Sequence, residues 1–163
     1  MITPLVEASD LTGFKGAPFP PAVMNGAAES LRTECEWHIA PVIESTVKIR
    51  AAGSDTILLP TLKLTEVVSV TGSDGQVVTG WDELENGVLE RPGGFPRFVT
   101  VVFKHGHTKC PPELLTVIAE RSVSAGSGRI SQESLGSRSV SLEAGYDSVS
   151  MAVIDKYRLY GRP

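Results

Sequence analysis

The chain has 163 residues, of which 41% are hydrophobic and 21% charged, and its formal net charge is −4. This length is typical of a single domain that buries a real core. The negative charge argues against a duplex-binding protein, which needs a basic face for the phosphates. No apolar stretch approaches the ~18 residues of a membrane span, and the first residues lack the basic and apolar regions of a signal peptide. We therefore expect a chain made in the cytoplasm.

The distribution of charge and the cysteine content narrow the class of protein further. Residues 1–44 carry six acidic and two basic residues, whereas residues 120–163 carry five acidic and six basic ones. An acidic surface repels DNA, which suits a passage for DNA better than a binding site. Cys35 and Cys110 are the only cysteines, so we interpret both as free thiols in a reducing compartment.

The chain begins with helical patterns. A short helical turn is expected at residues 7–11. Pro20 and Pro21 then open a long helix, because proline is tolerated in a first turn, and Pro41 limits that helix to about Ile39. Its apolar residues share one face: Val23, Met24, Ala27, Ala28, Leu31, Cys35, His38 and Ile39. Its polar residues share the other: Asn25, Glu29, Arg32, Thr33 and Glu36.

Between residues 42 and 104 the pattern changes to strands. Asp74-Gly75 and Asn86-Gly87 are strong signals for tight hairpin turns, because such turns need positive φ. In the last strand, Val99, Val101 and Phe103 alternate with residues of the opposite face, and Gly106 ends the strand. We expect a small antiparallel sheet or open barrel, with strands at residues 46–50, 56–59, 66–71, 81–85, 88–91 and 99–104.

The remaining chain returns to helices. Pro111 and Pro112 open a helix over residues 111–124 that places Leu114, Leu115, Ile118 and Ala119 on one face. Serine-rich segments at 129–134 and 137–142 predict a polar hairpin, which needs a neighbour to order it. A last helix is expected from Asp147 or Ser148 to about Tyr160. It has two apolar sides, of which one would face the core and the other a partner, without a preference between them. One side contains Val149, Val153, Ile154, Tyr157 and Tyr160, and the other contains Met151, Ala152 and Leu159.

Two groups of residues have the chemistry of an active site. His105, His107 and Cys110 are zinc-ligand types, and His38 or Cys35 could add a fourth ligand, but the spacing matches no standard zinc motif. Two solvated histidines in a loop at the end of a strand are the plainer interpretation. The second group surrounds the Asn86-Gly87 turn and is interpreted as a solvated face: Asp82, Glu83, Glu85 and Glu90. We therefore predict no metal, no cofactor and no catalytic residue.

The order of elements resembles the head-to-tail adaptor (head–tail connector) proteins of long-tailed bacteriophages. Four fragments carry the resemblance, in the same order over about 120 residues: Val101-Val-Phe-Lys-His-Gly106, Pro111-Pro-Glu-Leu114, the arm Gln132-Glu133-Ser134 with Gly136 and Ser139-Val140-Ser141, and Lys156-Tyr-Arg158. The insert at residues 42–104 is larger than in minimal members of that family, so its contacts are not carried over.

The resemblance implies an assembly function. Family members form a ring, expected to be twelvefold, that lies beneath the portal, extends the DNA channel and carries the stopper and the tail. It implies portal docking by Asp155, Lys156, Tyr157, Arg158, Leu159, Tyr160 and Arg162. It also implies an arm that contacts neighbouring subunits, formed by Gln132, Glu133, Ser134, Leu135, Gly136, Arg138 and Val140. The packaged DNA would pass through without sequence-specific binding.

The sequence therefore predicts an α+β fold. We expect one adaptor domain over residues 1–163, with a small helical bundle at residues 1–41 and 105–163, an inserted antiparallel β subdomain at residues 42–104 and a protruding hairpin arm. The bundle has three main helices and a short N-terminal one. The predicted function is that of a non-enzymatic structural protein in the neck of a virion. Two alternatives stay open: a metal-dependent hydrolase that uses His105 and His107, and a β-module that binds carbohydrate or protein through Trp81, Phe95 and Phe98.

Overall fold

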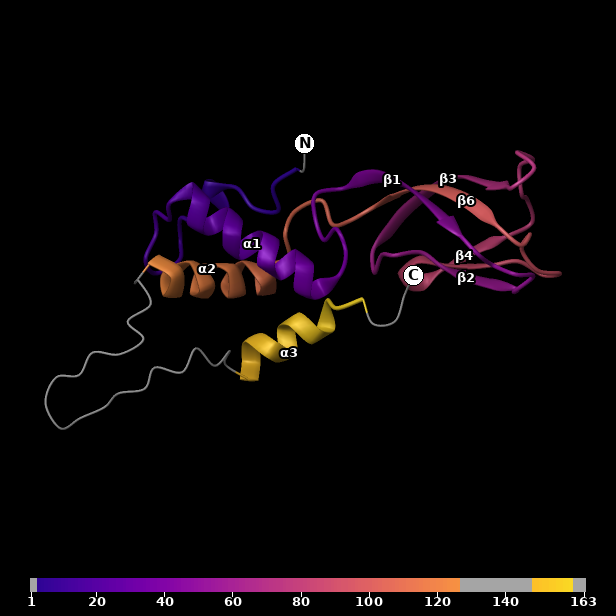
Figure 1. The fold of residues 1–163 in the computed structure, drawn as a ribbon. Helices are drawn as coiled ribbons and strands as arrows, with labels where there is room; N and C mark the ends of the chain where they lie inside the picture. The colour runs from indigo at the N-terminus through magenta and orange to yellow at the C-terminus, as the bar shows by residue number, and fades with distance from the viewer. Residues whose placement is uncertain (1–2, 127–147, 160–163) are drawn as a thin grey trace, which may run out of the picture. The chain divides into compact units, whose positions relative to one another are not determined.

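The structure is a computed structural model that describes residues 3–126 and 148–159 (Figure 1). None of the described helices is both long enough and apolar enough to span a membrane. The elements follow in the order η1 (Ala8–Leu11), α1 (Pro21–Cys35), β1 (Ile43–Ile49), β2 (Thr56–Leu58), β3 (Leu64–Gly72), β4 (Asp82–Leu84), η2 (Glu85–Gly87), β5 (Val88–Glu90), β6 (Val99–His105), α2 (Pro112–Gly126) and α3 (Ser148–Lys156).

The α+β class is confirmed, with three α-helices, a short N-terminal 3-10 helix and antiparallel strands inserted between α1 and α2. The hairpin arm expected at residues 129–142 lies outside the described residues. The chain divides into two compact units. We call residues 1–34 and 110–157 the helical unit and residues 35–109 and 158–163 the β unit. The single-domain organisation, with an insert at residues 42–104, stays a prediction.

In the helical unit, α1 begins as expected but ends four residues early. Glu36 has a φ of 66°, and a residue in this left-handed conformation ends a helix. Pro41 therefore set only an upper limit on the length of the helix. The predicted polar face also needs a correction at Arg32, which is buried. Its guanidinium lies 2.8 Å from a carboxylate oxygen of Glu29, one turn earlier, so the buried charge is paired.

Helix α2 has the predicted apolar face. Leu114 and Ile118 are fully buried, and the hydroxyl group of the buried Ser122 donates a 2.7 Å hydrogen bond to the carbonyl of Ile118. A nearly buried ion pair joins α2 to α1: both terminal nitrogens of Arg121 donate to the carboxylate of Glu34, at 2.9 and 2.8 Å. This paired geometry holds the two helices in register, because both hydrogen bonds require the same relative orientation.

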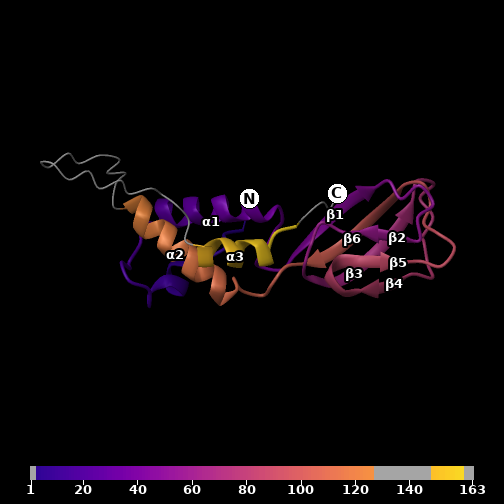
Figure 2. The same cartoon turned by 90° about the horizontal axis from the view of Figure 1, so that it is seen from below.

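The β unit contains two three-stranded antiparallel sheets (Figure 2). The first has the order β1-β6-β3, and the second has the order β2-β5-β4. In the first sheet, β6 pairs with β1 from Ile43↔His105 to Ile49↔Val99. The alternation expected for β6 is confirmed, because Val99, Val101 and Phe103 are buried while the residues between them are not. These side chains fill the core between the sheets together with Ile49, Ile57, Leu59, Val70, Leu89 and Phe95.

The two predicted turns differ in the structure. Asn86 and Gly87 have φ values of 60° and 72°, and they connect the paired strands β4 and β5 as expected. At the other turn, Gly75 has a φ of 78° but Asp74 is not in the left-handed region. After it the chain makes one isolated bridge, from Val77 to Thr71, and no paired strand.

Gly106 ends β6 in a position that only glycine fits. Its φ is 111°, and a Cβ atom there would lie 2.8 Å from the carbonyl oxygen of Pro41. We expect Gly106→Ala to lower the free energy of unfolding by about 3 kcal/mol, since it adds backbone strain and a backbone clash. Gly93→Ala is the matched control, because Gly93 has a φ of 87° and open space around it. It should cost only about 1 kcal/mol, and equal losses in urea unfolding would contradict the clash.

Candidate docking surfaces

Helix α3 carries the first part of the predicted docking segment, and it is shorter than expected. It ends at Lys156 and not at Tyr160. The amide of Tyr157 donates to the carbonyl of Ile154, three residues back, and the amide of Leu159 donates to the carbonyl of Cys35 at 2.9 Å. Because this amide has a partner outside the helix, the α-helical pattern stops. This partner, the carbonyl of Cys35, is far away in the sequence, so a local sequence pattern cannot predict it.

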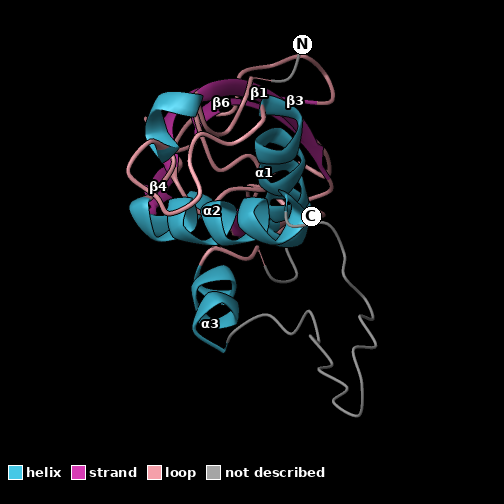
Figure 3. Cartoon of the chain, turned by 90° about the vertical axis from the view of Figure 1, so that its left-hand side faces the viewer, coloured by secondary structure: helices cyan, strands magenta, loops and turns pink. Residues whose placement is uncertain are grey.

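Helix α3 packs against α2 within the helical unit (Figure 3). The packed side consists of Ser150 and Ile154, which are buried, and the half-buried Tyr157. The hydroxyl group of Ser150 donates a 2.9 Å hydrogen bond to Glu120 of α2. The predicted side that contains both Val149 and Ile154 is therefore divided, because Ile154 is buried and Val149 is 65% exposed. Ser150, and not Val149, faces α2, because the carboxylate of Glu120 accepts its hydrogen bond.

A polar cluster fixes the C-terminal end of α3 to the first turn of α2. The ammonium group of Lys156 lies 2.8 Å from a carboxylate oxygen of Glu113, and the hydroxyl group of Tyr157 donates to the same carboxylate at 3.1 Å. These hydrogen bonds, that of Lys156 above all, hold the pKa of Glu113 below its usual value. Burial, followed by the hydrogen bond to Glu113, raises the pKa of Tyr157 to about 12. Both partners therefore keep the protonation states that the cluster needs near neutral pH.

Helix α3 also carries accessible apolar residues, on the same side of the helix as Lys156. Val149 and Ala152 are exposed, and Val153 is half-buried. We call these three residues the α3 outer strip. Val123, at 41% exposure, is a further exposed valine on α2. This strip is not the predicted second side: it contains Ala152 of that side and Val149 and Val153 of the other, while Met151 is half-buried and Leu159 is buried.

The predicted docking residues do not form one surface in the described chain. Asp155 and Lys156 are exposed, Arg158 is half-buried and Leu159 is buried at 2% exposure. Tyr160 and Arg162 lie outside the described residues, as does the predicted inter-subunit arm: Gln132, Glu133, Ser134, Leu135, Gly136, Arg138 and Val140. Because Leu159 is buried, its side chain is not available to a partner.

The histidines lie in the β unit, and His105 is not solvated as predicted. His105 is 4% exposed, and its Nε2 lies 3.0 Å from the hydroxyl group of Ser45. Burial, together with the nearby His38 ring at 6.0 Å between ring centroids, lowers the pKa of His105 to about 4. Its position explains the burial: it continues the inward alternation of β6 by one residue. The more exposed His107 lies against Trp37, with 6.1 Å between the ring centroids.

The other members of the proposed zinc set also have structural surroundings. Nε2 of His38 lies 2.7 Å from the carbonyl oxygen of Pro41, so this nitrogen carries the proton, because a carbonyl only accepts. Cys35 and Cys110 are both buried free thiols. Within residues 3–126 and 148–159, no group of three or more His, Cys, Asp or Glu side chains could hold a metal ion. The described residues therefore give the hydrolase alternative no support.

The acidic hairpin and the aromatic residues complete the predicted candidates. All four carboxylates of the hairpin are exposed, as expected for a solvated face: Asp82, Glu83, Glu85 and Glu90. Phe95 is buried, and the indole N–H of Trp81 donates to the carbonyl of Val78 at 2.9 Å. Phe98 is half-buried, with Lys48 and Arg97 close to its ring. Of the three predicted aromatic residues, Phe95 is therefore not accessible to a ligand, while Trp81 and Phe98 are half-buried.

The chain is similar to known proteins by its structure. No protein-family model matches the sequence, and no curated protein does so either. A chain in the neck of a native GTA (gene transfer agent) particle, computed with C12 symmetry, is 16% identical, with both chains covered completely and a TM-score of 0.57. A chain in the neck of an empty GTA particle, computed with C6 symmetry, is 15% identical and has a TM-score of 0.61. That match covers 98% of this chain and 94% of the other. The fold that the adaptor resemblance implied is confirmed: the whole chain has the fold of chains in a phage-like particle neck.

Proposed function

We propose that this chain is a structural protein of a phage-type virion neck, and that it forms an adaptor ring beneath the portal. The ring extends the DNA channel and offers a platform for the stopper and the tail. The observation that carries the proposal is the fold shared along the chain with chains of two GTA particle necks, one computed with C12 and the other with C6 symmetry. The acidic net charge of −4 supports a channel that DNA passes without being retained.

Helix α3 is the part of the helical unit best suited to dock on the portal. It uses one side for α2, and in its outer strip Val149 and Ala152 are exposed and Val153 is half-buried. The Glu113 cluster holds the end of the helix in place, so α3 meets a partner as a preformed element. Preformed elements lose less conformational entropy on binding. In this proposal Asp155 and the residues beyond Leu159 add polar contacts around the apolar strip.

The experiment that tests the proposal is a mass measurement by light scattering on a sizing column. The chain is measured alone and after mixing with the portal ring of the same virus. A particle whose mass equals the portal plus a ring of this chain supports the proposal. A variant that ends at Leu159 removes Tyr160 and Arg162 and retains every described C-terminal contact, so we expect it to bind the portal more weakly. A wild-type chain that never joins the portal would overturn the proposed function.

A further inference from the structure

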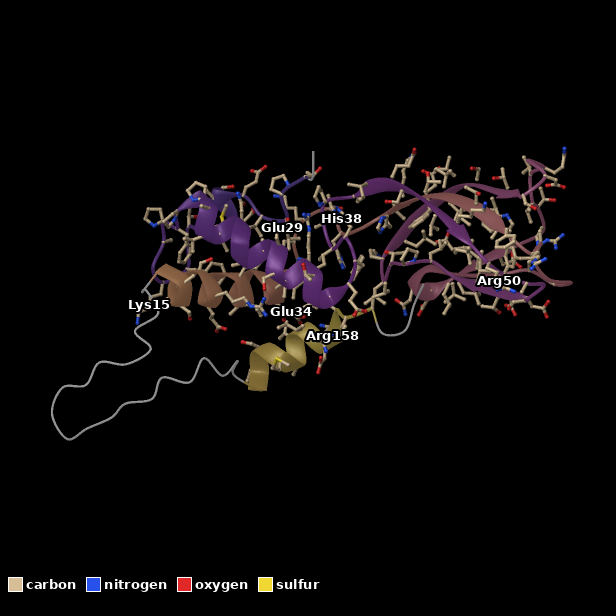
Figure 4. The ribbon with its side chains drawn as sticks, in the orientation of Figure 1. Lys15, Glu29, Glu34, His38, Arg50 and Arg158 are labelled. Carbon is tan, nitrogen blue, oxygen red and sulfur yellow. The ribbon has the colours of Figure 1, made fainter. Side chains whose placement is uncertain are left out.

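A basic surface with an aromatic centre lies at one end of the first sheet of the β unit. The Phe98 ring lies 5.6 Å from the ammonium nitrogen of Lys48 and 5.6 Å from the guanidinium carbon of Arg97, both measured to the ring centroid. Arg50 adds a third exposed cation at the end of β1, away from the end at which His38 lies (Figure 4). We call Lys48, Arg50, Arg97 and Phe98 the basic patch. In the part of the chain that the structure describes, its three cations form no ion pair with a carboxylate.

The second sheet of the same unit carries the opposite charge. Asp82 and Glu90 lie directly opposite each other in the β4–β5 pair, and like charges in this position destabilise a sheet. Glu83 and Glu85 add two more exposed carboxylates, and Leu84 between them is 45% exposed. No described residue forms an ion pair or a hydrogen bond with any of the four carboxylate side chains. The hairpin thus presents negative charge around one exposed leucine.

We propose that the basic patch of one copy binds the β4–β5 hairpin of the next copy in the ring. The two surfaces are complementary in two ways: three cations face four carboxylates, and the half-buried Phe98 offers an apolar contact for Leu84. A cyclic ring requires a heterologous interface, in which two different surfaces of the same chain meet. The contact would also relieve the repulsion between Asp82 and Glu90. This inference rests on the proposed function, because it concerns the ring that the proposed function requires.

Nucleic acid is the weaker candidate for the same patch. Its three cations would neutralise few phosphates, and the acidic hairpin on the same unit would repel the remainder of a DNA strand. A second copy of the chain brings the complementary charge itself. The test below therefore includes DNA binding as an outcome that counts against the proposal.

The test is a charge exchange between two variants. Variant A carries K48E and R97E, and variant B carries E83K and E85K. All four positions are exposed, so both variants should fold.

Each variant alone brings like charges together and should self-associate roughly a hundredfold more weakly than the wild type, as measured by sedimentation. In an equal mixture, the acidic patch of A meets the basic hairpin of B, and the basic patch of B meets the acidic hairpin of A. Association should return, in assemblies with an even number of subunits. The matched control is K109E, which makes the same substitution as K48E at an exposed lysine of the same unit outside the patch, and it should associate like the wild type.

The outcomes separate this inference from the proposed function. If the wild type joins a portal ring but A and B do so equally well, and their mixture behaves like either variant alone, the inference is wrong and the proposed function stands. If the wild type joins no portal ring, the proposed function fails first. If variant A loses binding to a mixed-sequence DNA duplex while the mixture restores no association, the patch binds nucleic acid and the inference is overturned.

Discussion

Val149→Asp together with Ala152→Asp should leave the chain folded and weaken its binding to the portal ring by about 100-fold, the loss expected for central apolar contacts of an interface. Both residues are exposed on α3 and do not belong to the side that packs against α2. The first substitution places an acid in the first turn of the helix, where negative charge is favourable. Folding should therefore survive, and the loss should appear only in the mass of the portal complex.

A matched control exists on the other unit. Val77 is 68% exposed, compared with 65% for Val149, so Val77→Asp makes the same chemical change on an equally accessible valine. We expect this control to bind the portal like the wild type. Equal losses for the control and the α3 variant would remove α3 from the docking surface. Unimpaired binding of the α3 variant would do the same and would leave the chain beyond Leu159 as the docking candidate.

The stability of the β unit should fall as the pH drops from about 6.5 to about 4. His105 has a pKa of about 4 in the folded chain and an ordinary value of 6.5 when unfolded. Between these values the unfolded chain binds a proton that the folded chain does not, so acid favours unfolding. The largest cause is burial, and the neighbouring His38 adds repulsion. A difference of this size corresponds to a loss of about 3 kcal/mol, complete near the lower pKa.

Urea unfolding at a series of pH values measures this loss, with tryptophan fluorescence as the probe. Trp37 and Trp81, the two tryptophans of the chain, both belong to the β unit. His105→Gln retains a polar partner for Ser45 but cannot be protonated, so its stability should depend much less on pH. His107→Gln is the control, because His107 is more exposed, and it should keep most of the acid sensitivity. An unchanged pH profile in His105→Gln would show that another group is responsible.

Local sequence patterns correctly predicted the elements in which buried and exposed residues alternate regularly. Strand β6 is central in its sheet, so each second residue faces the core, and the alternation of Val99, Val101 and Phe103 is undisturbed. Helix α2 likewise has one buried side. The Asn86-Gly87 turn was also predictable, because both residues adopt a positive φ that few others accept.

The errors arise where a distant residue supplies a partner. Helix α3 ends early because the carbonyl of Cys35 binds the amide of Leu159, and Val149 is exposed because Glu120 draws Ser150 to the packed side. Arg32 is buried beside Glu29, on the side that the periodicity assigned to solvent. His105 looked like the first residue of a loop but extends the buried face of β6. Periodicity describes neighbours in the sequence, and these contacts depend on the tertiary structure.

The candidate surfaces also differ in whether their residues are close together or far apart in the sequence. The acidic hairpin was visible in the sequence, since it lies within one short segment, whereas the two apolar sides of α3 were divided wrongly. The basic patch was not predicted, because Lys48 and Arg97 are far apart in the chain and become neighbours only through the β1–β6 pairing. A useful signal would have been the polar alternation of Lys48 and Arg50 on an edge strand, but only after β6 had been assigned as its partner.

The strand order β1-β6-β3 has a consequence for synthesis on the ribosome. The central strand β6 is the last of the three to be translated, and both neighbours pair with it. Until residue 105 has left the exit tunnel, β1 and β3 lack their pairing partner and expose apolar residues such as Ile49 and Val70. Such unpaired strands are the stage at which nascent chains aggregate. The chain itself therefore defines the interval that needs protection by chaperones, which closes when β6 emerges, before α2 and α3 have left the tunnel.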